Sequence, residues 1–204
     1  MNLSPSRLRA LFLIGLLLAA CSPSPQLSKL PPDAVILAFG DSLTHGTGAN
    51  ESESYPAVLA DLSDHEVVNA GVPGEISAAG LARLPDVLDE TQPSLLLLCH
   101  GGNDMLQKLD LMQTESNIRA MVREAQKRGV VVVLIGVPRP GLLLGTADFY
   151  KSVAADMNLT FEDEALADIL GQRKLKADPV HPNAAGYRQL AESVLILLKK
   201  HGAL

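Results

Sequence analysis

Four short apolar segments, each closely followed by glycine or proline, constrain the fold of this chain more than any other feature. They are residues 35–39, 66–70, 95–99 and 130–137. Each has the length of a strand and is rich in Val, Leu or Ile, which is typical of strands buried on both faces of a parallel sheet. The sequence therefore predicts a sheet of parallel strands.

Amphipathic helical patterns alternate with these strands. They cover residues 55–62, 77–90, 114–128 and 183–201. Pro85 is expected to kink or split the second helix, Thr114 to cap the third at its start and Gly129 to end it. Strand and helix in alternation predict an α/β fold, a three-layer α/β/α sandwich with a central parallel sheet. In such sheets functional groups gather at the carboxyl ends of the strands.

The first twenty residues are predicted to be a targeting signal and not part of the fold. Arg7 and Arg9 precede an unbroken apolar run over residues 10–20. This run is shorter than the roughly 17–25 residues that span a bilayer, and it suits the core of a signal peptide. The sequence Leu-Ala-Ala-Cys at 18–21 resembles the cleavage box of bacterial lipoproteins, which implies lipidation of Cys21. An ordinary secretory signal cut near Ala20, or an uncleaved anchor, is the alternative.

Residues 21–32 are rich in serine and proline and are predicted to form an extended tether, with the folded domain over residues 33–204. Acyl chains on Cys21 would hold the protein to a membrane. By the same resemblance, Ser22 after the cysteine favours the outer membrane. We therefore expect a lipid-anchored protein of the bacterial cell envelope that faces the periplasm.

Composition excludes several classes of function. The formal net charge is −6, which is the wrong sign for a nucleic-acid partner. Only two cysteines are present, too few for a disulfide framework. The chain contains neither a HExxH nor a CxxC pattern, and no glycine-rich phosphate-binding loop. We expect no nucleic-acid partner, no metal and no other cofactor, and a monomer.

Four polar motifs follow the predicted strands or precede the last helix. They are Gly-Asp-Ser-Leu with Ser42, Asn-Ala-Gly with Gly71, Gly-Gly-Asn-Asp with Asn103, and Asp178 three residues before His181. In this order they resemble the blocks of the SGNH (GDSL) hydrolase family. The wider segments FGDSLTHGTG and ADPVHPNAAG are most similar to its arylesterase/thioesterase/lysophospholipase branch. The resemblance implies a flavodoxin-like fold and a serine esterase that uses no cofactor.

The chemistry of these residue types suits ester hydrolysis. A serine hydroxyl needs a neighbouring base to become a nucleophile, and His181 is the candidate base for Ser42. Asp178 is the candidate that orients the imidazole, because residues at i and i+3 share one face of a helical turn. The resemblance adds three donors for the oxyanion of the intermediate: the N–H groups of Ser42 and Gly71 and the side-chain amide of Asn103.

Simpler interpretations of the same motifs exist. Taken singly, Gly-Asp-Ser indicates a turn, Gly-Gly-Asn-Asp a strand-to-loop junction, and residues 178–183 the start of a helix. Leu142, Leu143 and Leu144 form an apolar loop that either lines an acyl pocket or closes the core. Two other functions stay open: an O-acetylesterase or acetyltransferase acting on envelope carbohydrate, and a non-catalytic envelope lipoprotein. Thioesters and lysophospholipids are further candidate substrates.

Overall fold

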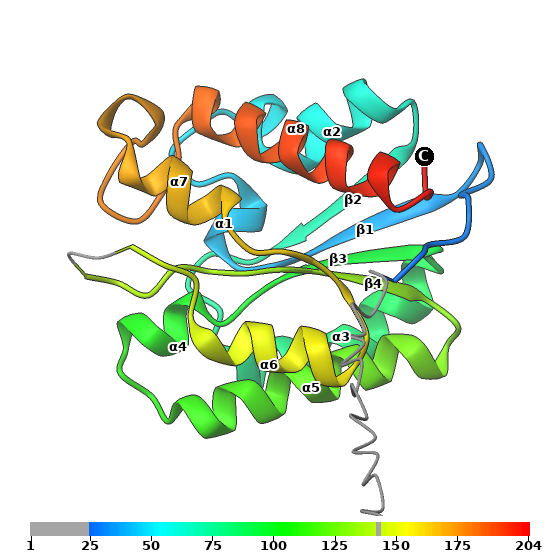
Figure 1. Cartoon of the computed structure of the whole chain (residues 1–204), viewed down its shortest axis with the longest axis horizontal. Helices are drawn as coiled ribbons and strands as arrows, with labels where there is room; N and C mark the ends of the chain where they lie inside the picture. Colours follow the sequence, from blue (N-terminus) through cyan, green and yellow to red (C-terminus); the bar gives the residue numbers. More distant parts are fainter. Residues whose placement is uncertain (1–24, 142–143) are drawn as a thin grey trace, which may run out of the picture.

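A computed structural model describes residues 25–141 and 144–204, in which five parallel strands form one sheet in the order β2-β1-β3-β4-β5 (Figure 1). The strands are β1 Val35–Gly40, β2 Glu66–Gly71, β3 Leu95–Cys99, β4 Val131–Ile135 and β5 Thr160–Glu162. This order is that of a flavodoxin-like doubly wound sheet, so the predicted fold class is confirmed. The sequence did not predict β5, whose three residues are too few to show a pattern.

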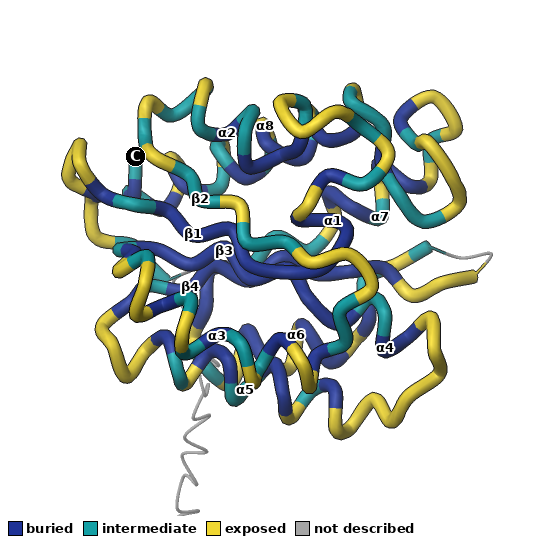
Figure 2. Tube along the Cα trace, turned by 180° about the vertical axis from the view of Figure 1, so that it is seen from behind, coloured by how far each residue is buried: buried dark blue, intermediate teal, exposed yellow. Residues whose placement is uncertain are grey.

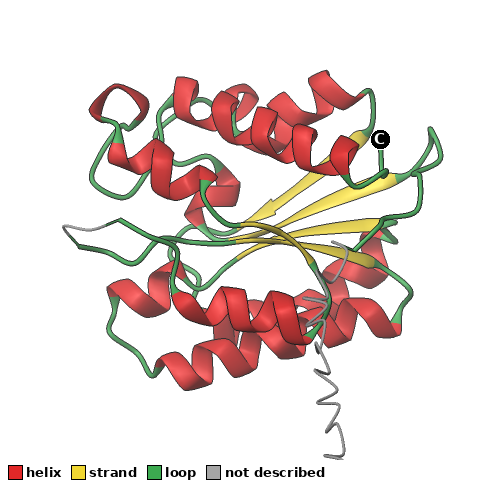
Figure 3. Ribbon diagram, viewed as in Figure 1, coloured by secondary structure: helices red, strands yellow, loops and turns green. Residues whose placement is uncertain are grey.

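Helices cover both faces of the sheet and complete the three layers (Figure 3). Helices α1, α2, α7 and α8 lie on one face and α3, α4, α5 and α6 on the other (Figure 1). Their bounds are α1 Ser42–His45, α2 Tyr55–Ser63, α3 Ser77–Thr91, α4 Gly102–Leu106, α5 Leu111–Lys127, α6 Asp148–Asp156, α7 Ala165–Gly171 and α8 Ala184–Lys200. Single 3-10 turns span Glu51–Glu53 and Arg173–Leu175.

The core lies between these layers and is densest around the two middle strands. Every residue of β3 is buried, as are all but the first of β1, whereas edge strand β2 is only partly covered (Figure 2). Two fully buried tyrosines reach from helices to loops at the carboxyl edge. The hydroxyl of Tyr150 donates to the carbonyl of His100 (2.6 Å) and that of Tyr187 to the carbonyl of Thr47 (2.8 Å). The loops at this edge are therefore tied to the packed layers.

The strand order reverses at β1, which pairs with β2 on one side and β3 on the other. The chain connections that leave the two neighbouring strands run to opposite sides of the sheet at such a point, and this leaves a crevice beyond the carboxyl ends of the strands. Gly40 ends β1 there, and a Cβ at this position would overlap the carbonyl oxygen of Cys99. The chain therefore turns sharply after β1, and it presents Ser42 above the crevice.

Two predictions about helices need correction. Pro85 does not split α3, which runs unbroken through it, because its buried face, which includes Leu84 and Leu88, offsets the single lost hydrogen bond. Helix α5 begins earlier than predicted and is capped by Asp110, whose carboxylate accepts from the N–H of Met112 (2.9 Å). Thr114 lies inside this helix with its hydroxyl donating to Asp104 (3.2 Å).

The segment before β1 also differs from the prediction. The carbonyl of Pro25 accepts from His201 Nδ1 (2.7 Å), and the N–H groups of Leu27 and Leu30 donate to the carbonyls of His201 and Ala203 (2.8 Å each). Leu30 is buried. Residues 25–30 therefore belong to the folded domain and are not a free tether, whereas the predicted signal and Cys21 lie outside the described residues. Within the described part of the chain, no helix is both long and apolar enough to cross a bilayer.

Candidate active site

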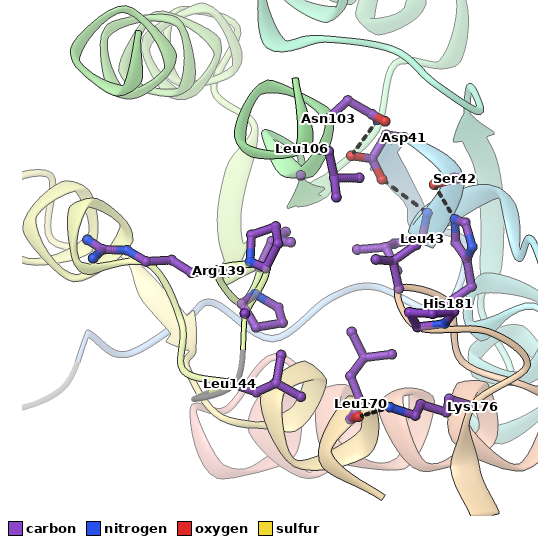
Figure 4. Close-up of a pocket in the computed structure, with 17 residues that line it drawn as sticks. Asp41, Ser42, Leu43, Asn103, Leu106, Arg139, Leu144, Leu170, Lys176 and His181 are labelled. Atoms are coloured by element: carbon purple, nitrogen blue, oxygen red, sulfur yellow. Dashed lines mark hydrogen bonds between the residues drawn. The ribbon is translucent and has the colours of Figure 1, made fainter. Parts of the chain in front are cut away.

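Ser42, His181 and Asp178 form a continuous line of hydrogen bonds. Figure 4 shows the contact between Ser42 and His181 at the edge of the pocket. The distance from Ser42 Oγ to His181 Nε2 is 2.9 Å, and His181 Nδ1 lies 2.7 Å from Asp178 Oδ2. Ser42 is the first residue of α1, while the other two lie in the loop before α8. The structure thus brings together three side chains that the sequence separates by up to 139 positions.

The carboxylate of Asp178 is held in one orientation. Its Oδ1 accepts from the backbone N–H groups of Val180 (2.8 Å) and His181 (2.9 Å), which leaves Oδ2 for the imidazole. Burial raises the pKa of Asp178, but the hydrogen bonds from His181 and from these two amides outweigh it and lower the pKa below its ordinary value. An ionised Asp178 requires the proton of His181 on Nδ1, so Nε2 is free to accept from the serine hydroxyl.

Asp41, the residue before the serine, is buried and connects two parts of the site. Its Oδ1 accepts from the N–H of Leu43 (3.0 Å) and caps α1, while its Oδ2 accepts from Asn103 Nδ2 (3.2 Å). Burial is the main cause that raises the pKa of Asp41. The capping contact orients the first turn of α1, whose leading N–H group, that of Ser42, has no partner within the helix.

Asn103 lies in the first turn of α4, across the crevice from Ser42. Its Nδ2 donates to the backbone carbonyl of Glu75 (3.0 Å) as well as to Asp41. One amide proton is therefore directed to the loop between β2 and α3, and the other to the serine side of the crevice. The contact with Glu75 was not predicted from sequence.

Gly71 does not lie where the sequence analysis expected it. Its N–H donates to the side-chain oxygen of Asn69 (3.0 Å), and a Cβ at this position would overlap the backbone N of His45. Gly71 therefore packs against the end of α1, and its N–H is already used by the side chain of Asn69. The predicted role of Gly71 as an oxyanion donor is wrong for this geometry. The loop that follows Gly71 holds Gly74, at φ 80°, with open space on its Cβ side.

A cavity of about 290 Å³ opens beside Ser42 and His181. Most of its wall is apolar, as Figure 4 shows for Leu43, Leu106, Leu144 and Leu170. The apolar or small lining residues are Leu43, Gly102, Leu106, Val137, Pro138, Pro140, Gly141, Leu144, Leu170, Pro179 and Val180. Of the two interpretations of residues 142–144, Leu144 thus fits the one in which the loop lines an acyl pocket. Leu142 and Leu143 lie outside the described residues.

The two cations of the pocket wall already have hydrogen-bond partners within the protein. Arg139 pairs with Asp148 (2.8 Å), and Lys176 Nζ donates to the carbonyl of Leu170 (3.0 Å). In residues 25–141 and 144–204, no group of three or more His, Cys, Asp or Glu side chains is arranged to hold a metal ion. That no cofactor is needed stays a prediction. The arrangement is suited to a nucleophile beside an apolar binding pocket.

Comparisons with known proteins agree with this chemistry. A model of the GDSL-like lipase/acylhydrolase family matches residues 38–189. The esterase TesA of Pseudomonas aeruginosa is 33% identical over 196 residues, which cover 91% of this chain and 98% of that protein. An arylesterase of Vibrio mimicus is 29% identical, with 96% and 98% covered. Among solved structures, the psychrotrophic esterase EstA from Pseudoalteromonas sp., inhibited by monoethylphosphonate, matches with a TM-score of 0.74 at 25% identity over 82% of this chain and 98% of that chain.

Proposed function

The chain belongs to the GDSL-like lipase/acylhydrolase family, and from that premise we propose that it cleaves carboxylic esters through an acyl-enzyme on Ser42. Family membership and relatives named as esterases make it an ester-hydrolysing enzyme. The roles of individual residues are our proposal. The observation that carries it is the 2.9 Å contact between Ser42 Oγ and His181 Nε2, with Asp178 on the far side of the ring.

The contact supports a two-step reaction. His181 Nε2 takes the hydroxyl proton as Ser42 Oγ bonds to the ester carbonyl carbon, and the carbonyl oxygen becomes an oxyanion. When this intermediate collapses, the alkoxide leaves with the proton from His181 and the acyl group stays on Ser42. Water then gives a proton to His181 and its oxygen bonds to the acyl carbon. When this second intermediate collapses, the bond between the acyl carbon and Ser42 Oγ breaks, and His181 returns the proton to Oγ. The carboxylic acid is released and the serine is regenerated.

The oxyanion needs donors that are aimed at it before the reaction begins. We assign the N–H of Ser42 and the second amide proton of Asn103, which the oxyanion would share with Asp41. For the third donor we propose the N–H of Gly74 in place of Gly71. Gly74 has no hydrogen bond among the described residues, and its loop is joined to Asn103 through the carbonyl of Glu75.

The apolar pocket favours substrates with an acyl chain over acetylated carbohydrate. Its wall offers hydrocarbon contact to several methylene groups and few free hydrogen-bonding groups for a sugar. Thioesters and lysophospholipids present the same carbonyl to Ser42, so we keep them as candidate substrates within this function. A non-catalytic role would give no reason for a serine, an imidazole and a carboxylate to be hydrogen-bonded beside such a pocket.

The test is labelling of the full-length protein in detergent with a fluorophosphonate probe, together with a panel of p-nitrophenyl esters of increasing chain length. Wild type should be labelled and should hydrolyse the esters. Ser42→Ala should lose both the label and nearly all activity, while the surface variant Ser28→Ala should keep them. Labelling that persists in Ser42→Ala, or ester hydrolysis at the wild-type rate, would refute the proposal.

We further propose that the protein is a monomer anchored to the bacterial cell envelope by lipid on Cys21, facing the periplasm. The support is the basic and apolar sequence that precedes Cys21. Metabolic labelling with palmitate should give a signal that Cys21→Ser abolishes. The matched control is Cys99→Ala, because Cys99 is a buried thiol and should not take part. Label that survives Cys21→Ser would exclude this anchor.

A further inference from the structure

Three charged or titratable side chains lie together behind Asn103, and the reaction proposed above does not use them. Glu75 precedes α3, Arg83 is in α3, and His100 follows β3. Only 7% of the Glu75 side chain and none of the His100 side chain is exposed to solvent. A cluster of such groups is costly to bury unless each is paired, so its contacts indicate what it holds in place.

Glu75 and Arg83 form a two-pronged ion pair. Arg83 Nε donates to Glu75 Oε1 (2.9 Å) and Nη2 to Oε2 (2.8 Å). The same guanidinium also donates to the carbonyl of Ala70 (3.1 Å) and stacks 4.2 Å from the ring centre of Phe39. It is therefore fixed against both β1 and β2, and through it the position of the Glu75 side chain is fixed as well.

His100 holds the other side of Glu75. The N–H of Gly101 donates to His100 Nδ1 (2.9 Å), so the ring proton lies on Nε2 and is donated to Glu75 Oε2 (3.1 Å). The backbone of His100 is held in turn by the hydroxyl of Tyr150. Glu75 is thus clamped between α3 and the turn that leads from β3 to Asn103.

The consequence concerns the backbone of Glu75, because its carbonyl accepts one of the two amide protons of Asn103. We propose, on the basis of the proposed function, that Glu75, Arg83 and His100 are positioning residues that fix this carbonyl and thereby aim the second amide proton of Asn103 at the oxyanion. Without a fixed acceptor, the amide of Asn103 rotates, or flips and presents its oxygen to the oxyanion. Such a preorganised donor contributes to kcat and little to substrate binding.

A double-mutant cycle tests this role on the full-length protein with one p-nitrophenyl ester. Asn103→Ala alone should lower kcat about 10²–10³-fold. Arg83→Met alone should lower kcat roughly tenfold with KM within about twofold, because the pocket is untouched. If Arg83 acts through Asn103, Arg83→Met should lower kcat by less than about threefold in the Asn103→Ala background. Arg83→Lys, which keeps the charge but not the fork, should be intermediate.

The control is Arg119→Met. Arg119 is likewise a paired arginine, held by the carboxylates of Glu115 and Asp156, but it lies between helices α5 and α6 away from the crevice. It should lower thermal stability with kcat unchanged. If Arg83→Met does not fold, Glu75→Gln takes its place in the cycle, because glutamine keeps the shape of the side chain and removes its charge.

The outcomes separate two claims. The positioning role would be overturned if Arg83→Met lowered kcat tenfold in wild type and equally in the Asn103→Ala background. It would also be overturned if Arg83→Met lowered kcat in neither. Full activity of Asn103→Ala or Ser42→Ala would instead overturn the proposed function. A loss confined to KM would also contradict the proposal, since it would place Arg83 in substrate binding.

Discussion

Replacement of Gly80 by alanine tests how rigidly the cluster behind Asn103 is packed. Gly80 lies in the first half of α3, with its Cα facing the ring of His100. A Cβ at this position would overlap His100 Nε2 and would lie 2.8 Å from Cδ2 of the same ring and 3.2 Å from Glu75 Oε2. Carbon atoms in favourable contact are about 3.5–4.0 Å apart, so the ring would have to move by roughly 1 Å.

Two effects of opposite sign compete in Gly80→Ala. Alanine favours the helix by about 1 kcal/mol over glycine. Against this, overpacking costs about 1–3 kcal/mol, and loss of the hydrogen bond between His100 and the charged Glu75 about 1.5–3 kcal/mol. The ring has little freedom to retreat, because it is fully buried and the N–H of Gly101 holds its Nδ1. We therefore expect a net destabilisation of about 1.5–5 kcal/mol.

The assay is urea unfolding followed by circular dichroism, in which the midpoint should fall while the slope stays constant. Gly171→Ala is the matched control: it ends α7, and a Cβ there would meet nothing within 4 Å. It should be neutral or stabilising by up to about 1 kcal/mol. If Gly80→Ala is as stable as wild type or more so, the ring of His100 moves freely and the reasoning fails.

Three further predictions follow from the site. Asp178→Asn should lower kcat about 10⁴-fold, because an amide that donates to His181 Nδ1 moves the ring proton to Nε2; near-normal kcat would contradict this. Burial raises the pKa of Glu75, but hydrogen bonds to it outweigh burial and lower the pKa from 4.5 to about 2. Stability from this carboxylate is thus complete above pH 4.5 and is lost as the pH falls to about 2. Over that range wild type should lose up to about 3 kcal/mol, and Glu75→Gln markedly less, in urea unfolding at each pH. Leu106→Gln should lower kcat/KM about tenfold for octanoate esters and little for acetate esters; equal losses would place Leu106 outside acyl binding.

The sequence predicts those parts of the fold whose pattern is local. Strand β3 was predicted with its exact bounds, because a run of five apolar residues followed closely by glycine has the length of a buried strand. The end of α5 was also predicted, because glycine favours the left-handed conformation that ends helices, and Gly129 adopts it at φ 75°. The start of α5 was not, because Thr114 is a good capping residue by type, yet Asp110, four residues earlier, caps the helix. The hydroxyl of Thr114 lies within hydrogen-bond distance of the Asp110 carbonyl and of Asp104 instead.

The same distinction holds at the site. Asp178 and His181 are three residues apart, so a sequence motif contains their contact, and Ser42 is marked by its turn. Gly71 ends β2 and Gly74 follows three residues later in the loop. Only the three-dimensional path of the chain shows that the N–H of Gly71 has a partner and that of Gly74 has none in the part of the chain that the structure describes. The contact of Glu75 with His100 spans 25 positions with no motif, which sequence patterns cannot reveal.

The hydrogen bond between Pro25 and His201 determines which way an anchored molecule would face. His201 follows the last turn of α8, whereas His181 lies just before its first, and the 17 residues of this helix separate them by about 25 Å. Only four residues lead from Cys21 to Pro25, a reach of about 14 Å. Lipid on Cys21 would therefore keep the end of the domain that carries Pro25 and His201 against the bilayer and turn the mouth of the pocket away from it. Substrate would then arrive from the aqueous side and not by lateral diffusion in the membrane.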